Sequence, residues 1–307
     1  MRTFEDMIFT MKAMTPPMGW NTWNTFGLDI SEELICSLAD TMEKDGYLAA
    51  GYEYLVIDDG WAEKERDADG KLQADRKKFP RGIKAVADSY RSTPDIFDNF
   101  RSFTEIFLSQ LPHFSLSASH CFNDLDMLTV GMNGSGNAAI GKSCSEEEYR
   151  MQFAMWCLAS SPLFIGADIR SVSAETKALL LNKALIAINQ DAECRPPLLL
   201  SRRFVVVPVE NTADAVRPLR EEKDKLFVFI KHLSDSAFAL AFFNLFEADE
   251  EMTAMFEEAG LPESAPFGFR MKDAFTGEEC GLHREYFRTV VKAHECRLFI
   301  CSIEATK

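Results

Sequence analysis

Tyr54-Leu55-Val56-Ile57-Asp58-Asp59-Gly60-Trp61 is the stretch that decides the fold. Its apolar first half predicts a short, buried strand, and its two carboxylates follow directly where that strand ends. An amphipathic helix is predicted just before it, with one apolar face made of Leu34, Ile35, Leu38 and Met42. A helix that leads into an entirely apolar strand is typical of a parallel sheet covered by helices.

The same alternation returns between residues 145 and 191. Ser145 and Glu148 form a Ser-x-x-Glu capping box, which predicts the start of a helix. Pro162–Gly166 (PLFIG) then predicts a second buried strand, and a further helix is expected from about Ser173. Strands that alternate with helices in this way indicate an α/β protein, as in a (β/α) barrel.

The pattern of predicted elements changes in the C-terminal third of the sequence. Pro196-Pro197 and the charged stretch Arg217–Lys225 are expected to separate the two patterns. Beyond it, Leu226–Ile230 and Ala237–Phe243 are rich in β-formers and flank a short polar turn, which predicts a hairpin. Further strands are expected near residues 267–269, 286–291 and 297–303. Together these runs predict a small antiparallel β-domain.

Length and composition fit a globular protein of two domains. The chain has 307 residues, of which 47% are hydrophobic and 26% charged, and roughly 100–200 residues make one domain. We predict an N-terminal extension over residues 1–13, a barrel-type catalytic domain over 14–200 and a β-sandwich over 201–307. The net charge of −15 argues against nucleic acid as a partner, because a phosphate backbone is bound through Lys and Arg.

The terminus, the cysteines and the histidines suggest where the protein resides. Residues 1–13 mix charged and apolar side chains, unlike a secretory signal, and no apolar run approaches the ~18 residues of a membrane span. The eight cysteines contain no Cys-x-x-Cys pair, which is typical of a reducing compartment. The five histidines show no recognised metal spacing. We therefore expect a cytoplasmic protein without a membrane partner, metal or cofactor.

Candidate functional residues follow the predicted strands. In a (β/α) barrel the active site lies at the carboxyl ends of the strands. Four segments there carry indoles, carboxylates or an arginine: Met18–Trp23, Ile57–Trp61, Arg91–Ile96 and Asn123–Leu128. Indole faces stack on the apolar faces of sugar rings, and carboxylates accept hydrogen bonds from hydroxyls. A carbohydrate is the natural ligand of such a rim.

The ordinary alternative holds for each segment alone. An aspartate after a strand is more often a helix cap or a turn former than a catalyst, and a single tryptophan is usually part of a core. The order of the segments along the chain and their exact residue patterns decide between the two interpretations.

Thr15–Trp23 and Gly51–Trp61 closely resemble the α-galactosidases (melibiases) of glycoside hydrolase family 27. The family's pattern continues in the same order at residues 72–75, 79–84, 162–170 and 188–191. The resemblance covers about Met14–Asp191, and the β-domain fits the family's sandwich more loosely. It implies a TIM-type (β/α)8 barrel that cleaves terminal α-linked galactose with retention of configuration.

The resemblance also implies roles for individual residues. Asp95 matches the general acid/base, which protonates the leaving oxygen and then acts as a base toward water. Asp58 and Asp59 match the pair that accepts hydrogen bonds from the sugar hydroxyls. The remaining matches are an aromatic wall, a substrate contact beside the acid/base and two pocket residues: Trp23, Arg91, Asp126 and Met127.

The match to the family breaks off where the nucleophile should be. The family carries it on the fourth strand, in a segment of the form Tyr-Leu-Lys-Tyr-Asp-Asn-Cys, and this chain has no such segment. The sequence passes from the helix expected over residues 82–89 to Arg91, which matches the sixth strand. About 90 residues of three βα units are therefore missing. We predict an incomplete barrel with the first, second, sixth, seventh and eighth strands, followed by a C-terminal antiparallel β-sandwich.

Three hypotheses follow, because retaining hydrolysis needs two carboxyl groups about 5–5.5 Å apart. In the first, the chain is a hydrolase in which Asp58, Asp59 or Asp126 replaces the nucleophile. In the second, it is a non-catalytic remnant that binds an α-galactoside weakly through Trp23, Asp58 and Asp59, or is inert. In the third, an internal deletion or a faulty gene model hides a complete enzyme. The exposed sheet edges could be covered by closing a smaller sheet or by a homo-oligomer.

Overall fold

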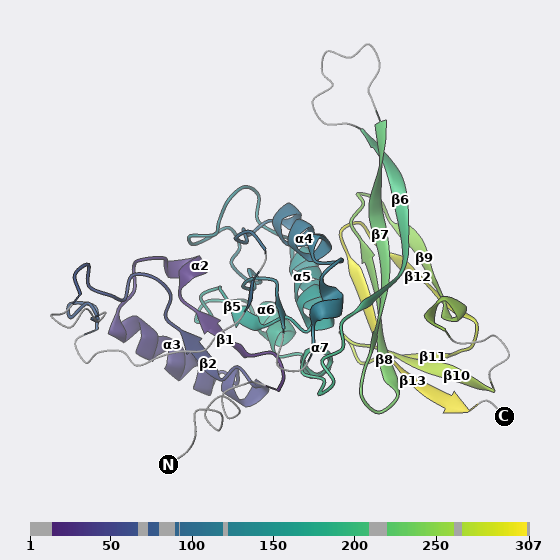
Figure 1. Cartoon of the computed structure of the whole chain (residues 1–307), viewed down its shortest axis with the longest axis horizontal. Helices are drawn as coiled ribbons and strands as arrows, with labels where there is room; N and C mark the ends of the chain where they lie inside the picture. The colour runs from purple at the N-terminus through teal and green to yellow at the C-terminus, as the bar shows by residue number, and fades with distance from the viewer. Residues whose placement is uncertain are drawn as a thin grey trace, which may run out of the picture. The chain divides into compact units, whose positions relative to one another are not determined.

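The computed structural model describes residues 14–66, 73–79, 90–91, 93–118, 122–208, 220–260 and 266–305. The predicted extension over 1–13 and the junction expected near Ser89 lie outside them. Two compact units make up the chain, Met1–Cys194 and Arg195–Lys307 (Figure 1). They divide close to the boundary predicted at residue 200.

A parallel sheet lies at the centre of the first unit. Its strands are β1 (Met18–Asn21), β2 (Tyr54–Val56) and β5 (Leu163–Ile165), in the order β2-β1-β5. The strands predicted at Tyr54–Ile57 and within Pro162–Gly166 are therefore confirmed, and they run parallel. β5 is largely buried, as expected for a parallel sheet covered by helices. The prediction that β2 is buried is wrong: Tyr54 is 39% exposed, and Leu55 and Val56 are half-buried. Among the described strands β2 pairs only with β1, so its other edge is not covered by a neighbouring strand.

Two further parallel strands lie later in the first unit. β3 (Tyr90–Arg91) pairs with β4 (Asn123–Asp124). Just after β4, Leu128 forms a parallel bridge with Ile165 of β5. The Leu128 N–H donates to Phe164 over 2.8 Å, and the Gly166 N–H donates back to Leu128 over 2.9 Å. The chain that leaves β4 therefore runs beside β5, on the side opposite β1.

Most helices of the first unit begin at a capping side chain. The α-helices are α2 (Trp23–Phe26), α3 (Glu32–Lys44), α4 (Phe100–Ser109), α5 (Glu146–Leu158), α6 (Ala174–Leu180) and α7 (Lys183–Asn189). The N-caps of α3 to α7 accept hydrogen bonds from the first turn through Ser31, Asn99, Ser145, Ser173 and Asn182. The predicted capping box at Ser145 and Glu148 is confirmed. Short 3₁₀ turns lie at Leu48–Ala50 and Phe114–Leu116.

The second unit is an antiparallel β-structure in two layers. One layer has six strands in the order β11-β10-β13-β8-β7-β6, and the other is the pair β12-β9. The bounds are β6 (Leu198–Pro208), β7 (Arg220–His232), β8 (Ala237–Asn244), β9 (Glu250–Met255), β10 (Phe267–Asp273), β11 (Glu279–His283), β12 (Tyr286–Val291) and β13 (Cys296–Ala305), with a 3₁₀ turn at Phe256–Ala259. The predicted hairpin is β7–β8, and the later predicted strands are β10, β12 and β13. Sequence patterns do not predict β6, β9 and β11.

Aromatic side chains fill the core between the two layers. The ring of Phe299 on β13 lies 6.1 Å from that of Phe242 on β8 and 4.8 Å from that of Phe287 on β12. Offset and edge-on ring pairs at such distances stabilise a core beyond the area they bury. These contacts join the six-stranded layer to the β9–β12 pair and make the unit a β-sandwich.

One prediction for this unit is wrong. Of the two predicted separators, Pro196-Pro197 lies just after the boundary between the units, but Arg220–Lys225 of the second one belongs to β7. Pairing of β7 with β8 begins only at Leu226, while its pairing with β6 continues to Arg220. Figure 1 shows the two strands continuing as a ribbon beyond the end of β8. Lys223 and Asp224 are exposed there, so this part of the strand needs no apolar pattern.

Candidate active site

The ends of β1 and β2 are joined by side-chain hydrogen bonds. The Nδ2 of Asn21, the last residue of β1, donates to Oδ2 of Asp58 over 3.0 Å. The backbone N–H of Asp58 donates to the hydroxyl of Thr22 over 2.9 Å. Parallel pairing of Asn21 with Val56 puts these groups side by side. The first predicted sugar-binding carboxylate is therefore held by the end of the neighbouring strand.

Asp59 and Trp23 lie at the same end of the sheet. The N–H of Asp59 donates to Oδ1 of Asp58 over 2.8 Å, and the Asp59 side chain is exposed. The N–H of Trp23 donates to Oδ1 of Asn21 over 2.8 Å, and its indole is half-buried. The side chain of Asn21 thus links the backbone of Trp23 to the carboxylate of Asp58, and the backbone N–H of Asp59 caps the same carboxylate.

Asp126 connects the segment after β4 to the predicted acid/base segment. Its Oδ2 accepts the N–H of Ile96 over 2.9 Å, and its Oδ1 accepts the N–H of Met127 over 2.7 Å. Asp126 is 9% exposed and adopts a φ of 74°, a conformation that Asp tolerates better than most residues. Since Ile96 follows Asp95 directly, this carboxylate fixes the backbone beside the predicted proton donor. Asp95 itself is exposed.

The other predicted site residues lie around this connection. Met127 is buried, with 8% of its side chain exposed. Arg91 lies on β3, opposite Asp124 of β4. Sequence patterns do not single out Asn21, Thr22 or Asp98 as site residues. The first two are polar residues directly at a strand end, which is the signal that could have found them.

Asp98 anchors the far side of the acid/base segment. It is 1% exposed, and its carboxylate accepts the N–H of Gly134 and the hydroxyl of Tyr149, each over 2.8 Å. Burial raises the pKa of Asp98 above its ordinary value, although hydrogen bonds from Gly134, Tyr149 and Cys144 act in the opposite direction. No local pattern marks this residue, because its partners lie far along the chain.

The raised pKa of Asp98 predicts a pH-dependent stability. The folded chain keeps a proton on Asp98 over a pH range in which the unfolded chain has lost it, so ionisation of Asp98 opposes folding. As the pH rises from about 4 through this range, the free energy of unfolding of the wild type should fall relative to that of Asp98→Asn. Urea denaturation of both proteins across this range measures the difference. Parallel pH curves would contradict the prediction.

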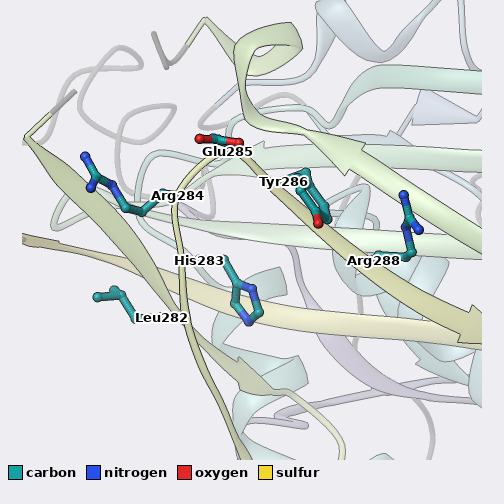
Figure 2. Close-up of a pocket in the computed structure, with 6 residues that line it drawn as sticks. All are labelled: Leu282, His283, Arg284, Glu285, Tyr286 and Arg288. Atoms are coloured by element: carbon teal, nitrogen blue, oxygen red, sulfur yellow. The ribbon is translucent and has the colours of Figure 1, made fainter. Parts of the chain in front are cut away.

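An open pocket also lies on the second unit, at the turn between β11 and β12 (Figure 2). Its lining is Leu282, His283, Arg284, Glu285, Tyr286 and Arg288. Figure 2 shows Arg284 extending away from Tyr286 and Arg288. Arg288 lies 5.6 Å from the Tyr286 ring centre and 3.4 Å from Glu251. With one carboxylate in its lining, this pocket does not supply the pair that glycoside hydrolysis requires.

The described part of the chain has neither a metal-binding cluster nor a membrane-spanning helix. No group of three or more His, Cys, Asp or Glu side chains is placed there to hold a metal ion. None of its helices is both long and apolar enough to cross a membrane.

Similar proteins include α-galactosidases from plants. The α-galactosidase of Cyamopsis tetragonoloba is 26% identical over 385 aligned positions, which cover 94% of this chain and 86% of that protein. Alpha-galactosidase 2 of Arabidopsis thaliana is 26% identical over 384 positions, which cover 94% and 89%. Both alignments are longer than the 307 residues of this chain. Each must therefore contain long gaps on the side of this chain.

Solved structures share the fold. α-Galactosidase I of Mortierella vinacea has a TM-score of 0.80 at 21% identity, and the match covers 96% of this chain and 98% of that one. The α-galactosidase of Saccharomyces cerevisiae with raffinose has a TM-score of 0.79 at 18% identity, and the match covers 95% and 98%. At these identities the likeness concerns the fold, a TIM barrel with a C-terminal β-sandwich.

The family itself follows from the sequence models of its two domains. The model described as alpha galactosidase A matches residues 15–93 and 85–191, more than half of the chain. The model described as the alpha galactosidase C-terminal beta sandwich domain matches residues 223–301. The strand-end carboxylates fall within the first match, and most of the β-sandwich, from β7 to β13, falls within the second. This chain therefore belongs to the α-galactosidases of glycoside hydrolase family 27.

Proposed function

We propose that this chain takes up a terminal α-linked galactose at the carboxyl ends of β1, β2 and β3, in an α-galactosidase-type site. One observation carries the proposal: at the end of the sheet, Asn21 and the carboxylate of Asp58 are hydrogen-bonded to the backbone N–H groups of Trp23 and Asp59, which brings the three predicted residues together. An indole face and a pair of acceptor-only carboxylates suit a sugar, which is apolar on its ring faces and rich in hydroxyl donors. The proposed ligand is a small α-galactoside.

The proposed roles follow from this arrangement. Asp59, which is exposed, and Asp58, which is held by Asn21, accept hydrogen bonds from the sugar hydroxyls. Asp95 gives a proton to the glycosidic oxygen as the bond to C1 breaks, and then takes a proton from the attacking water. Arg91 and Met127 complete the pocket, and Asp126 holds the segment that carries Asp95.

We further propose that the barrel is incomplete and that this chain lacks the nucleophile. Residues 57–89 connect β2 to β3, and three further βα units of about 30 residues each do not fit within them. Among the described strands, β2 pairs only with β1 and β3 only with β4, whereas a closed barrel gives every strand two neighbours. The long gaps in the plant alignments also support this proposal.

The missing segment supports a second candidate function, which is sugar binding without retaining hydrolysis. Acid assistance by Asp95 cannot form a glycosyl-enzyme intermediate unless a second carboxylate attacks C1. A third explanation is an internal deletion or a faulty gene model, which sequencing across the junction near residues 89–91 would settle. The proposals of a cytoplasmic location and of a homo-oligomer that covers the sheet edges rest on the sequence alone.

Galactose calorimetry and an aryl α-galactoside assay test these functions together. Galactose should release heat with the wild type, and Asp59→Ala should weaken binding by about tenfold or more, because a hydrogen bond to a charged group is worth about 1.5–3 kcal/mol. Glu53→Ala is the matched control, since Glu53 is an exposed carboxylate at the amino end of the same strand. Hydrolysis that is lost in Asp95→Asn identifies a catalyst, and binding without hydrolysis identifies the second candidate. The absence of heat in the wild type would refute both.

A further inference from the structure

Asn21 occupies an unusual position in the cluster at the end of β1. It is only 9% exposed, yet both polar atoms of its side chain are hydrogen-bonded within the site. The Oδ1 accepts the N–H of Trp23 over 2.8 Å, and the Nδ2 donates to Asp58 over 3.0 Å. The amide orientation follows from chemistry, because a backbone N–H needs an acceptor and a carboxylate needs a donor. The amide therefore connects the predicted aromatic wall to a predicted sugar-binding carboxylate.

The hydrogen bonds around Asp58 leave its carboxylate little freedom to rotate. Its Oδ2 faces Asn21, its Oδ1 accepts the N–H of Asp59, and its own N–H donates to Thr22. Thr22 is fully buried, and its N–H donates to the carbonyl of Val56 on β2 over 3.2 Å, so the support is tied to the sheet. Each carboxylate oxygen can accept a further hydrogen bond. The orientation of the Asp58 carboxylate, and with it the direction of its free acceptor positions, is consequently fixed in the free protein. This reduces the entropy lost on binding.

We infer that Asn21 is a positioning residue that holds Asp58 ready to accept sugar hydroxyls. The identity of the ligand in this inference, a sugar, rests on the proposed function. The orienting hydrogen bond is a property of the free protein and can be tested without a ligand. The residue acts through Asp58 and not by touching the sugar.

Two substitutions separate positioning from packing. Asn21→Asp keeps the shape of the side chain and the acceptor for Trp23, but it sets a second carboxylate oxygen against Asp58. Asn21→Ala removes the amide and adds no charge. We expect Asn21→Asp to weaken galactose binding about tenfold or more, and at least as much as Asn21→Ala does. A role in packing alone predicts the reverse order, because the aspartate fills the space and the alanine leaves it empty.

A pH series of melting temperatures provides the ligand-free measurement. Two carboxylates that face each other share a proton as the pH falls. The decrease in melting temperature that Asn21→Asp causes relative to the wild type should therefore be smaller at about pH 5 than at about pH 7. The loss in Asn21→Ala should stay constant. Asn182→Asp is the control: it makes the same chemical change at the N-cap of α7, where the retained oxygen still accepts from Ala184 and Leu185.

The melting series and the binding measurement can each contradict the inference on its own. If Asn21→Asp melts like the wild type at both pH values, Asn21 does not hold Asp58 and the inference is overturned. If Asn21→Asp shows the pH-dependent loss but binds galactose as tightly as the wild type, the orienting hydrogen bond exists and has no role in binding, which also overturns it. If the wild type binds no galactose, the proposed function fails, and the role of Asn21 toward a sugar fails with it. The pH series still reports on the hydrogen bond in that case.

Discussion

Sodium azide is expected to accelerate the release of phenol from phenyl α-galactoside by this chain about tenfold or more, because the proposed site has a proton donor but no nucleophile of its own. Azide would attack C1 from the face opposite the leaving group and form the C1–N bond as the C1–O bond breaks. Asp95 would give its proton to the departing phenol oxygen. Phenol release with and without azide measures the rate, and NMR of the product should show β-galactosyl azide.

The matching variant for this experiment is Asp95→Asn. Phenol is a poor leaving group, so loss of the acid should lower the azide-dependent rate by about 10²–10⁴-fold. Glu53→Ala should leave it unchanged, because Glu53 lies at the opposite end of β2. Rapid hydrolysis without azide, with galactose released in the α configuration, would refute the proposal that the nucleophile is missing. It would show that a carboxylate within this chain attacks C1.

The second large effect is on stability. Trp20→Ala should lower the free energy of unfolding by about 3–5 kcal/mol, because a large, fully buried side chain leaves a cavity when it is removed. Trp20 has no exposed surface, its ring lies 6.0 Å from that of Phe26, and its Nε1 donates to the carbonyl of Ala167 over 2.8 Å. The residue lies on β1, which pairs with both β2 and β5. Urea denaturation measures the change.

Two further substitutions divide the Trp20 effect into its parts. Trp20→Phe keeps much of the apolar ring but leaves the Ala167 carbonyl without its donor, so a loss of about 1–3 kcal/mol is expected. Leu116→Ala removes a leucine that is 67% exposed, and it should change stability by no more than about 0.5 kcal/mol. A Trp20→Ala loss as small as that of Leu116→Ala would mean that Trp20 is not part of the core.

The three carboxylates considered as substitute nucleophiles differ in their surroundings. Asp126 is 9% exposed, and each of its oxygens accepts a backbone N–H. Both oxygens of Asp58 are also engaged, by Asn21 and Asp59. Asp59 is the exposed member of the set. If the azide experiment reveals hydrolysis by the chain alone, Asp59 is therefore the first carboxylate to replace.

Local patterns predicted those elements whose signal lies within a few neighbouring residues. Tyr54–Ile57 and Leu163–Ile165 are apolar throughout and both contain parallel strands, although only the second is largely buried. Ser145 with Glu148 marks a helix start by chemistry that needs no distant partner. Patterns failed for Arg220–Lys225, where a strand extends beyond its sheet and needs no apolar face. The helix expected from about Ser173 is present as two short helices, α6 and α7.

The sequence by itself determined the family, the strand that precedes Asp58 and Asp59, and the antiparallel character of the C-terminal unit, because collinear motifs and short-range apolar patterns carry that information. Only the tertiary structure decided that Asn21 and Thr22 hold Asp58, and that Asp126 fixes the backbone beside Asp95. Those hydrogen bonds join residues 37, 36 and 30 positions apart. They exist because parallel strands bring their carboxyl ends together, and no spacing along a single chain specifies which side chains then meet.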